Sequence, residues 1–249
     1  DSLTRPDFAK NHVARQWLIA PSVVVRYPFS ENFCTAFRRD KAFDAKWMYE
    51  LQQMNISVEN GLVWTQSNNY LAESIGGINK LLSGPLEEML FSPRPFEFEK
   101  PVVLCPDTGF YHFIFEILPN VLHILDHVDD VTILVSKGAS AYVVEALKLL
   151  LGSEAFAEKV QITFGTFQVS KLLFIPIYPR SGFAHPEDIK RLIRFSDFVG
   201  SDSTLEKGKK IYISRDRAPS RRVKNEDVIF DALAEVGFER VYLETMSLR

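Results

Sequence analysis

This sequence has little cysteine, no long apolar run and no strong excess of charge of one sign. Its two cysteines, Cys34 and Cys105, are too few for a disulfide framework and have no metal-binding spacing. No stretch reaches the roughly 18 consecutive apolar residues of a membrane span, and the first residues lack the pattern of a signal peptide. These absences exclude a disulfide-stapled miniprotein. Because the chain begins at Asp1 rather than at methionine, we expect it to be trimmed there, which leaves a preceding anchor or targeting segment open.

The composition is that of an ordinary globular protein, with 249 residues, 46% of them apolar and 24% charged. The formal net charge is only −3, but it is unevenly distributed. Residues 207–224 carry eight basic side chains against one acid, Asp216, so the remainder of the chain is acidic. A local basic cluster on an acidic body indicates one defined anionic ligand rather than a nucleic-acid surface.

From residue 101 onward, apolar β-branched runs alternate with stretches of helical length. The predicted strands cover residues 102–104, 131–135, 160–164, 171–177, 210–214 and 240–243. The predicted helices cover residues 110–128, 141–151, 185–198 and 225–236. This alternation is typical of βαβ units, so the predicted fold class is α/β, with a Rossmann-like, mostly parallel sheet and flanking helices.

Residues 1–100 are less regular. The pattern there predicts a strand at 23–25, a helix over 41–54, and a hairpin of 56–58 and 62–64 around the turn Asn60-Gly61.

A change of composition near residues 200–208 predicts a domain boundary. We expect a first lobe over residues 1–205, irregular over 1–100 and Rossmann-like over 101–205, and a second segment over residues 206–249. Such a short segment cannot bury a doubly wound sheet by itself. It therefore either completes the preceding sheet or begins a second α/β lobe.

The loop after the predicted strand 210–214 is the first candidate for binding chemistry. Ser214 and Arg215 come at the carboxyl end of that strand, where open α/β sheets bind ligands. The next helix, capped by Asn225, offers unpaired N–H groups to an anion. Between them lie three more arginines: Arg217, Arg221 and Arg222. These residues predict a diphosphate site, with a solvated basic loop as the alternative, and the carboxylates of Glu226 and Asp227 at the same helix start argue against the site.

The second candidate is the predicted helix that starts at Phe110. At about 100° per residue, an arc of about 80° holds a polar stripe, formed by His112, Glu116, Asn120, His123 and His127. Such a stripe is usually a solvated face, but here histidines and a carboxylate replace the expected lysines. His112, in the first turn after a strand, is placed to act as a base or to bind ligand in the same crevice as the arginine loop. His123 and His127 give a metal hydrolase as a weaker alternative, without an evident third ligand.

Two segments together resemble the signatures of family 61 glycosyltransferases, which include capsular polysaccharide enzymes. Residues 109–119, GFYHFIFEILP, are similar to the family's N-Y-F-H-W helix that leads to L-P. Residues 212–215, YISR, and 220–226, SRRVKNE, are similar to its Y-I-S-R run followed by R-R, a hydrophobic residue and N-E. Gly109 and Phe113 stand where the family has Asn and Trp, which implies different contacts with the acceptor.

The resemblance implies a two-lobed GT-B architecture and an inverting transfer of a sugar from a nucleotide-sugar donor to a glycan or polysaccharide hydroxyl. The first lobe would hold the acceptor. His112 matches the family's histidine in that lobe, and we predict that it is the general base, with Asp107 and Glu116 behind it. The second lobe would hold the donor, through Ser214, Arg215, Arg221, Arg222, Asn225 and Glu226.

The resemblance also implies partners. They are a nucleotide sugar and a glycan acceptor, with no nucleic acid, and membrane association through segments outside this chain stays open. No DxD-type acidic pair stands in an evident loop, so we expect no cofactor and no essential metal. The family's later H-G-A motif would lie beyond Arg249, which implies an incomplete second lobe and a fragment that can be inactive by itself.

Two matters are left open by the sequence. The compartment would be the cytoplasm or a membrane surface in a bacterium, and the secretory pathway in a eukaryote. The alternative function is a non-catalytic α/β module that binds a nucleotide or an anionic polysaccharide through the basic residues 207–224.

Overall fold

The computed structural model describes most of the chain, as two compact units. Unit 1 is Asp1–Arg194 and unit 2 is Phe195–Arg249. The described residues are 3, 6–26, 40–71, 74, 93–95, 98–107, 109–177, 184–199, 209–218, 222–243 and 248. Among them, no helix is both long enough and apolar enough to span a bilayer.

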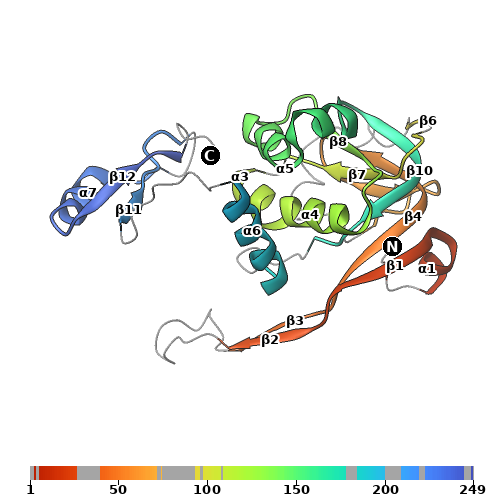
Figure 1. Cartoon of the computed structure of the whole chain (residues 1–249), viewed down its shortest axis with the longest axis horizontal. Coiled ribbons are helices and arrows are strands. Elements are labelled where there is room, and N and C mark those ends of the chain that lie inside the picture. Colours follow the sequence, from red (N-terminus) through yellow and green to blue (C-terminus); the bar gives the residue numbers. More distant parts are fainter. Residues whose placement is uncertain are drawn as a thin grey trace. The chain divides into compact units, whose positions relative to one another are not determined.

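Unit 1 contains most of the secondary structure (Figure 1). Its elements as far as the first parallel strand are α1 (Pro6–His12), β1 (Val13–Ala20), β2 (Val23–Arg26), β3 (Asp40–Phe43), β4 (Lys46–Ser57), β5 (Val63–Thr65), β6 (Arg94–Pro95) and β7 (Val102–Cys105). The elements that follow are α3 (Phe110–His112), the π-helical turn η3 (Phe113–Ile117), α4 (Leu118–His127), β8 (Thr132–Ser136), α5 (Ala141–Lys159), β9 (Val160–Thr163), β10 (Thr166–Phe174) and α6 (Pro186–Val199).

An eight-stranded sheet forms the centre of unit 1, in the order β1-β4-β10-β7-β8-β9, with β5 on β4 and β6 on β10. β10, β7, β8 and β9 are mutually parallel, whereas β4 runs antiparallel to both β1 and β10. The run β7–α4–β8–α5–β9 is the predicted succession of βαβ units. The α/β class with a mostly parallel central sheet is therefore confirmed.

The helix predicted over residues 41–54 is wrong, because this segment forms β3 and β4. Lys, Met, Glu, Leu and Gln are good helix formers, which accounts for the prediction. In the structure β4 has a partner on each side, with Leu51 opposite Val13 of β1 and opposite Leu172 of β10. Pairing along both edges buries Met48 and Leu51 completely, so tertiary packing overrides the local helix preference.

The hairpin predicted from residues 56–58 and 62–64 is confirmed, since β4 and β5 pair antiparallel with Ile56 opposite Val63. Gly61 in the turn has a φ of 68° and lies against Pro106. A Cβ at this position would come within 2.7 Å of the proline Cγ. Only glycine fits both the positive φ and this close approach.

Several other predictions differ from the structure only at their boundaries. The strand predicted over 171–177 begins earlier and ends earlier, as β10. The helix predicted over 141–151 continues to Lys159, with Gly152 at a φ of 74° marking a kink inside α5. The helix predicted from Phe110 is continuous to His127, but it includes a π-helical turn just before Pro119, whose missing amide hydrogen removes one helical bond.

Unit 2 contains β11 (Lys210–Ile213), α7 (Glu226–Ala234) and β12 (Phe238–Val241). The two strands are parallel and form a separate two-stranded sheet, with Tyr212 opposite Arg240. Whether this segment completes the preceding sheet or begins a second α/β lobe stays a prediction. Gly237, with a φ of 87°, ends the turn after α7, as its position after the helix predicts.

Candidate functional site

Asp107 ties the start of the helix Phe110–His127 to the neighbouring helix α5. Its carboxylate accepts hydrogen bonds from the Gly109 amide (3.2 Å), the Ser140 amide (2.8 Å), the Ser140 hydroxyl (2.6 Å) and the Tyr142 hydroxyl (2.6 Å). Burial would raise the pKa of Asp107, but these four donors outweigh it and lower the pKa. Burial and the bond to Asp107 raise the pKa of Tyr142 to about 12. Asp107 thus holds the turn between β7 and α3 in place.

His112, the last residue of α3, pairs with Glu116, which lies in the π-helical turn η3. His112 Nδ1 lies 2.9 Å from Glu116 Oε1, and the two side chains are 40% and 18% exposed. A carboxylate only accepts hydrogen bonds, so Nδ1 carries the proton and Nε2 of the neutral ring keeps its lone pair. The pair therefore presents an oriented, accessible base. π-Helical turns of this kind occur often at functional sites.

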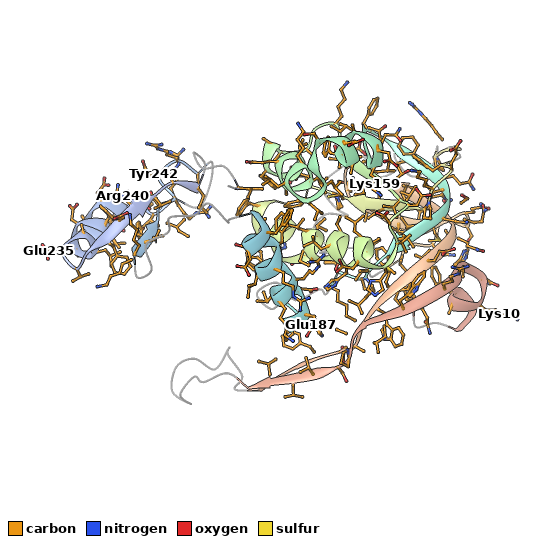
Figure 2. The ribbon with its side chains drawn as sticks, viewed as in Figure 1. Lys10, Lys159, Glu187, Glu235, Arg240 and Tyr242 are labelled. Atoms are coloured by element: carbon orange, nitrogen blue, oxygen red, sulfur yellow. The ribbon has the colours of Figure 1, made fainter. Side chains whose placement is uncertain are left out.

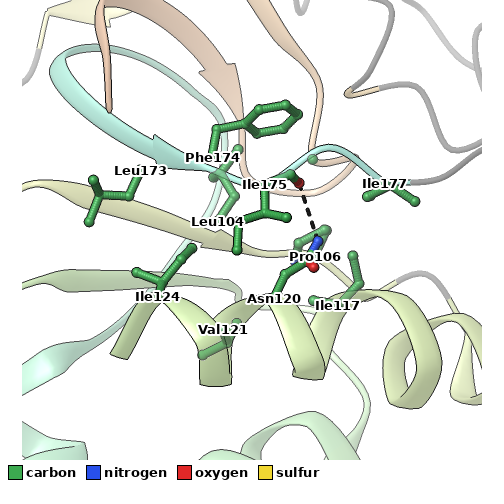
Figure 3. Close-up of a pocket in the computed structure, with 11 residues that line it drawn as sticks. Leu104, Pro106, Ile117, Asn120, Val121, Ile124, Leu173, Phe174, Ile175 and Ile177 are labelled. Atoms are coloured by element: carbon green, nitrogen blue, oxygen red, sulfur yellow. Dashed lines mark hydrogen bonds between the residues drawn. The ribbon is translucent and has the colours of Figure 1, made fainter. Parts of the chain in front are cut away.

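The polar stripe on this helix is not a solvated face, because Asn120 and His123 are buried. Figure 3 shows Asn120 on α4 pointing toward the end of β10, where its Nδ2 donates to the Ile175 carbonyl at 3.2 Å. His127 Nδ1 lies 2.8 Å from the His123 carbonyl oxygen. Among the described residues, no three metal-ligating side chains are grouped as a metal site would require.

His123 of this stripe belongs to a buried ionic cluster with Lys46 and Asp188. Asp188 Oδ1 accepts from Lys46 Nζ at 2.5 Å and from His123 Nε2 at 2.9 Å. All three side chains are less than 10% exposed. Burial would raise the pKa of Asp188, but the two donors outweigh this effect and lower the pKa. Burial lowers the pKa of Lys46, although the negative charge of Asp188 acts to raise it.

The sequence pattern does not identify Lys46 or Asp188 as candidate site residues. Lys46 falls in the segment with helical composition, and Asp188 is one of two acids in the first turn of α6, where acids are common. The only signal toward them is the unusual histidine content of the stripe. Their contact joins positions 142 residues apart, which sequence spacing does not reveal.

Two hollows adjoin Asn120. One is mainly apolar, encloses about 410 Å³ including the solvent at its mouth, and lies between α4, β7 and the end of β10 (Figure 3). The other is polar and encloses about 270 Å³, counted in the same way. The polar pocket is lined by Lys46, Phe115, Glu116, Asn120, Pro176, Ile177, Ala184, His185 and Asp188.

In unit 2, the end of β11 is fastened to the start of α7 by Glu226. The Arg215 amide donates to Glu226 Oε1 at 2.8 Å, and the buried Ser214 receives the Asp216 amide on its hydroxyl at 3.2 Å. Burial would raise the pKa of Glu226, but hydrogen bonds from the Arg215 amide and from the Ser214 and Tyr212 hydroxyls lower it. Glu226 is thus engaged within its own unit.

Asp227 is also engaged, since Arg240 Nη1 donates to it at 2.8 Å. The same guanidinium lies over the Phe230 ring, 4.1 Å from its centroid, and Figure 2 shows Arg240 and Tyr242 among the side chains of unit 2. Asn225 occupies the cap position of α7, as predicted, but its side chain makes no capping hydrogen bond.

Four exposed basic side chains surround the junction of β11 and α7: Arg215, Arg217, Arg222 and Lys224. Arg217 stacks on Tyr242 at 4.0 Å, and Arg222 Nε donates to the Ala218 carbonyl at 2.7 Å. Arg221 lies outside the described residues. The end of β11, the start of α7 and the described arginines therefore lie at one junction, as the loop pattern predicts. A role for these residues in binding a ligand stays a prediction.

The predicted site residues belong to two different units. Asp107, His112 and Glu116 are in unit 1, and the predicted donor-binding residues are in unit 2. The expectation that both sets line one crevice stays a prediction.

Comparison with models of known protein families gives a match over the second half of the chain. The model of a family described as Glycosyltransferase 61 matches residues 110–249, which is more than half of the chain and includes both sets of predicted site residues except Asp107. No curated protein matches the chain.

Proposed function

Since the chain belongs to glycosyltransferase family 61, we propose that it moves a hexosyl or pentosyl group from a nucleotide-sugar donor to a hydroxyl of a glycan or polysaccharide acceptor, with inversion at the anomeric carbon. In this proposal unit 1 binds the acceptor. Unit 2 is part of the nucleotide-sugar-binding lobe of a GT-B architecture. No nucleic acid takes part.

The observation that carries the proposal is the His112–Glu116 pair. Glu116 fixes the tautomer of His112, so that Nε2 can take a proton. The acceptor hydroxyl gives its proton to Nε2 while its oxygen bonds to the anomeric carbon from the face opposite the diphosphate. The bond from that carbon to the diphosphate oxygen breaks, and the electron pair leaves with the nucleoside diphosphate. A single displacement of this kind inverts the configuration.

Asp107 acts in this proposal as a positioning residue. Four donors already occupy its carboxylate, and their effect lowers its pKa. A carboxylate in that state is a poor proton acceptor at neutral pH. Its contribution is to fix the turn from which His112 projects.

The leaving diphosphate needs positive charge, and we assign that role to the arginines of unit 2. Arg215 and Arg222 are exposed beside the N-terminus of α7, and Arg221 belongs to the same loop. Planar guanidinium groups suit phosphate oxygens in pairs. Ser214, Asn225 and Glu226 shape the same strand-to-helix junction. With this charge available, the proposed reaction needs no metal ion and no further cofactor.

Calorimetric titration with UDP, GDP, CMP and pyrophosphate tests the donor site. We expect preference for one nucleoside diphosphate, and about 10- to 100-fold weaker binding in Arg215→Ala and in Arg221→Ala, because each loses a charge-assisted hydrogen bond. Lys209→Ala is the matched control, since it removes one positive charge from unit 2 at a side chain paired with Glu239. Equal, salt-sensitive binding of every anion would reject the donor site and favour the non-catalytic module.

Turnover of the preferred nucleotide sugar tests the base. His112→Gln should lower turnover by about 10²- to 10⁴-fold and leave nucleotide affinity unchanged, because His112 belongs to the other unit. Glu116→Gln, which keeps a hydrogen-bond acceptor near Nδ1, should lower turnover less. Unchanged turnover in His112→Gln would remove His112 from the mechanism.

A further inference from the structure

We infer that the polar pocket of unit 1 holds one bound water molecule, and that this water orients Glu116 toward His112. Asn120 and Lys46 hold the water, which makes them positioning residues for the proposed base. This inference rests on the proposed function and adds to it the residues that stand behind the base. The pocket is lined from β4, η3, α4 and the start of α6, so four elements meet at the water.

The size of the pocket suits one water molecule. Its volume of about 270 Å³ counts the gaps between the lining atoms and the solvent at the mouth. The centre of a water molecule can occupy about 20 Å³ of it, and about 10–15 Å³ of such space is enough for one water. A bound water also needs polar partners, typically about three. The lining supplies them from β4, η3 and α4.

The first partner is Asn120 Oδ1. Asn120 is 9% exposed, and its Nδ2 donates to the Ile175 carbonyl at 3.2 Å (Figure 3). That bond fixes the orientation of the amide, because only its nitrogen can donate to a carbonyl. Oδ1 is buried and accepts no hydrogen bond from the residues that the structure describes. A buried acceptor without a donor is destabilising, and a water that donates to Oδ1 removes this penalty.

The other two partners are Glu116 and Lys46. Glu116 precedes Asn120 by four residues on the same continuous helix, and both line the pocket. Residues at this spacing share a face, so one water can donate to Asn120 Oδ1 and to the Glu116 carboxylate. Lys46 Nζ has three N–H donors, one of which bonds Asp188 Oδ1 at 2.5 Å. In this arrangement a second N–H of Lys46 donates to the water oxygen, which gives the water three hydrogen bonds.

The ionic cluster gives Lys46 a fixed position. The Lys46 side chain is 2% exposed, and the Asp188 carboxylate oxygen that holds it also accepts from His123 Nε2 at 2.9 Å. His123 lies on α4, the helix that carries Asn120. Lysine is a flexible side chain when it is exposed, but here its ammonium is held from two sides of the pocket. The water is therefore bound between groups that do not move apart.

The water acts on the base through Glu116. Glu116 Oε1 lies 2.9 Å from His112 Nδ1, and this contact keeps the proton on Nδ1 and the lone pair on Nε2. The Glu116 side chain is 18% exposed, and a glutamate has several rotamers to choose from unless a second contact holds it. The water holds the carboxylate in the rotamer that faces His112. Asn120 and Lys46 thus determine how much of His112 is in the reactive tautomer.

A crystal structure of the whole chain tests the water in the natural protein. We expect an ordered water within about 3.2 Å of Asn120 Oδ1, of a Glu116 carboxylate oxygen and of Lys46 Nζ. This measurement does not depend on the folding of a variant. A structure without an ordered water at Asn120 Oδ1, or with a water there that does not contact Glu116, would overturn the inference.

Nitrogen-15 NMR of the imidazole rings tests the positioning role, because the nitrogen shifts show which ring nitrogen carries the proton. Spectra are recorded at about pH 8, where an ordinary histidine is neutral, and His112→Gln assigns the His112 signals. Asn120→Leu should lower the ratio of Nδ1-protonated to Nε2-protonated His112 about three- to ten-fold, the effect of one lost hydrogen bond. Turnover should fall by a similar factor.

Asn55→Leu is the matched control. Asn55 is 3% exposed, its Nδ2 donates to the Thr65 carbonyl at 3.2 Å, and its Oδ1 accepts nothing from the described residues. It therefore loses the same kind of contact in the same unit, but it is not among the residues that line the pocket. The tautomer ratio of His112 should be unchanged in this variant.

Equal changes in Asn120→Leu and Asn55→Leu would overturn the positioning role, and so would an unchanged tautomer ratio in Asn120→Leu. The water and the tautomer are both observed without turnover, so neither depends on sugar transfer. The proposed function fails separately, through the nucleotide titration and through His112→Gln. Turnover that is lost in His112→Gln, with a His112 tautomer that ignores Asn120, would retain the base and reject the water.

Discussion

Units 1 and 2 differ in how deeply their apolar side chains are buried. Unit 1 buries large side chains completely, among them Trp64, Phe113 and Met48. In unit 2, the buried hydrophobic residue in the described part is the small Ala218, whereas Ile213 is 54% exposed and Val228 is 70% exposed. Unit 1 therefore has the core of an independent domain, and unit 2 has a strand–helix–strand frame with little core.

The units also differ in how they hold their polar groups. In unit 1, the buried side chains of Lys46, His123 and Asp188 form an ionic cluster, in which Asp188 accepts from the other two. Unit 2 joins the end of β11 to the start of α7 through the buried Glu226, which accepts from the Arg215 amide, and Arg240 lies over the Phe230 ring. By contrast, basic side chains of unit 2 are exposed, among them Arg215, Arg217, Arg222 and Lys224.

Breaking the ionic cluster should produce the largest effect on stability. Asp188→Ala leaves Lys46 and His123 buried without their carboxylate, and we expect a loss of about 3–5 kcal/mol in the free energy of unfolding. Urea denaturation followed by tryptophan fluorescence measures it for unit 1 alone, because Trp17, Trp47 and Trp64 all belong to unit 1.

Glu187→Ala is the matched control for this change. Glu187, labelled in Figure 2, is the adjacent acid on α6. It pairs at the surface with Lys190, so its loss should cost about 1 kcal/mol or less. The double variant Lys46→Met with Asp188→Asn should recover part of the stability, because no uncompensated charge remains. Equal losses for Asp188→Ala and Glu187→Ala would contradict the importance of the cluster.

The same truncation in a strand of each unit measures the difference in core directly. Ile56→Ala in β4 removes a fully buried side chain and should cost about 2–5 kcal/mol. Ile213→Ala in β11 removes a half-exposed one and should change stability by about 0.5 kcal/mol or less. Urea denaturation gives the first value, and amide hydrogen exchange of residues 209–243 gives the second. Similar costs at both positions would mean that unit 2 buries more apolar surface in solution.

Sequence reasoning predicts the fold best where local signals and tertiary packing agree. The strands and helices from residue 101 onward follow from alternating apolar runs, and Gly61 and Gly237 mark turns that need a positive φ. In the segment 41–54 the two disagree. Its residues favour a helix locally, and they form a strand only through pairing with β1 and β10. No local pattern contains that information.

Some residues of the candidate site follow from local sequence patterns, and others depend on contacts between distant segments. His112 and Glu116 are found from helical spacing, since residues four apart share a face. The junction of Ser214, Arg215 and Glu226 is found from a strand end followed by a helix start. Lys46 and Asp188 are not found, because their role depends on a contact between distant segments. Spacing also leaves open whether Asn120 and His123 are solvated, since their burial depends on contacts with Ile175 and with Asp188 of α6.

The smallest predicted effect concerns pH, and it should be confined to unit 1. All five histidines belong to unit 1. Burial lowers the pKa of His185 from 6.5, outweighing the favourable effect of Asp188, while Lys46 lowers it further. In the unfolded chain this histidine has its ordinary pKa, so below about pH 6.5 the unfolded state binds more protons than the folded state. The stability of unit 1 should therefore fall as the pH falls from 7.5 to 5.5.

His185→Asn isolates this contribution, because asparagine can accept the Glu187 amide at the start of α6 but does not titrate. Urea midpoints of unit 1 at pH 7.5 and 5.5 should differ less in the variant than in the natural chain. The carboxylates of Asp107 and Asp188 do not interfere, since their lowered pKa values place their loss of stability below about pH 3.8. Hydrogen exchange of residues 209–243, corrected for the intrinsic effect of pH, should report an unchanged opening free energy. An identical pH dependence in natural and variant chains would mean that His185 is protonated as easily in the folded unit as in the unfolded chain.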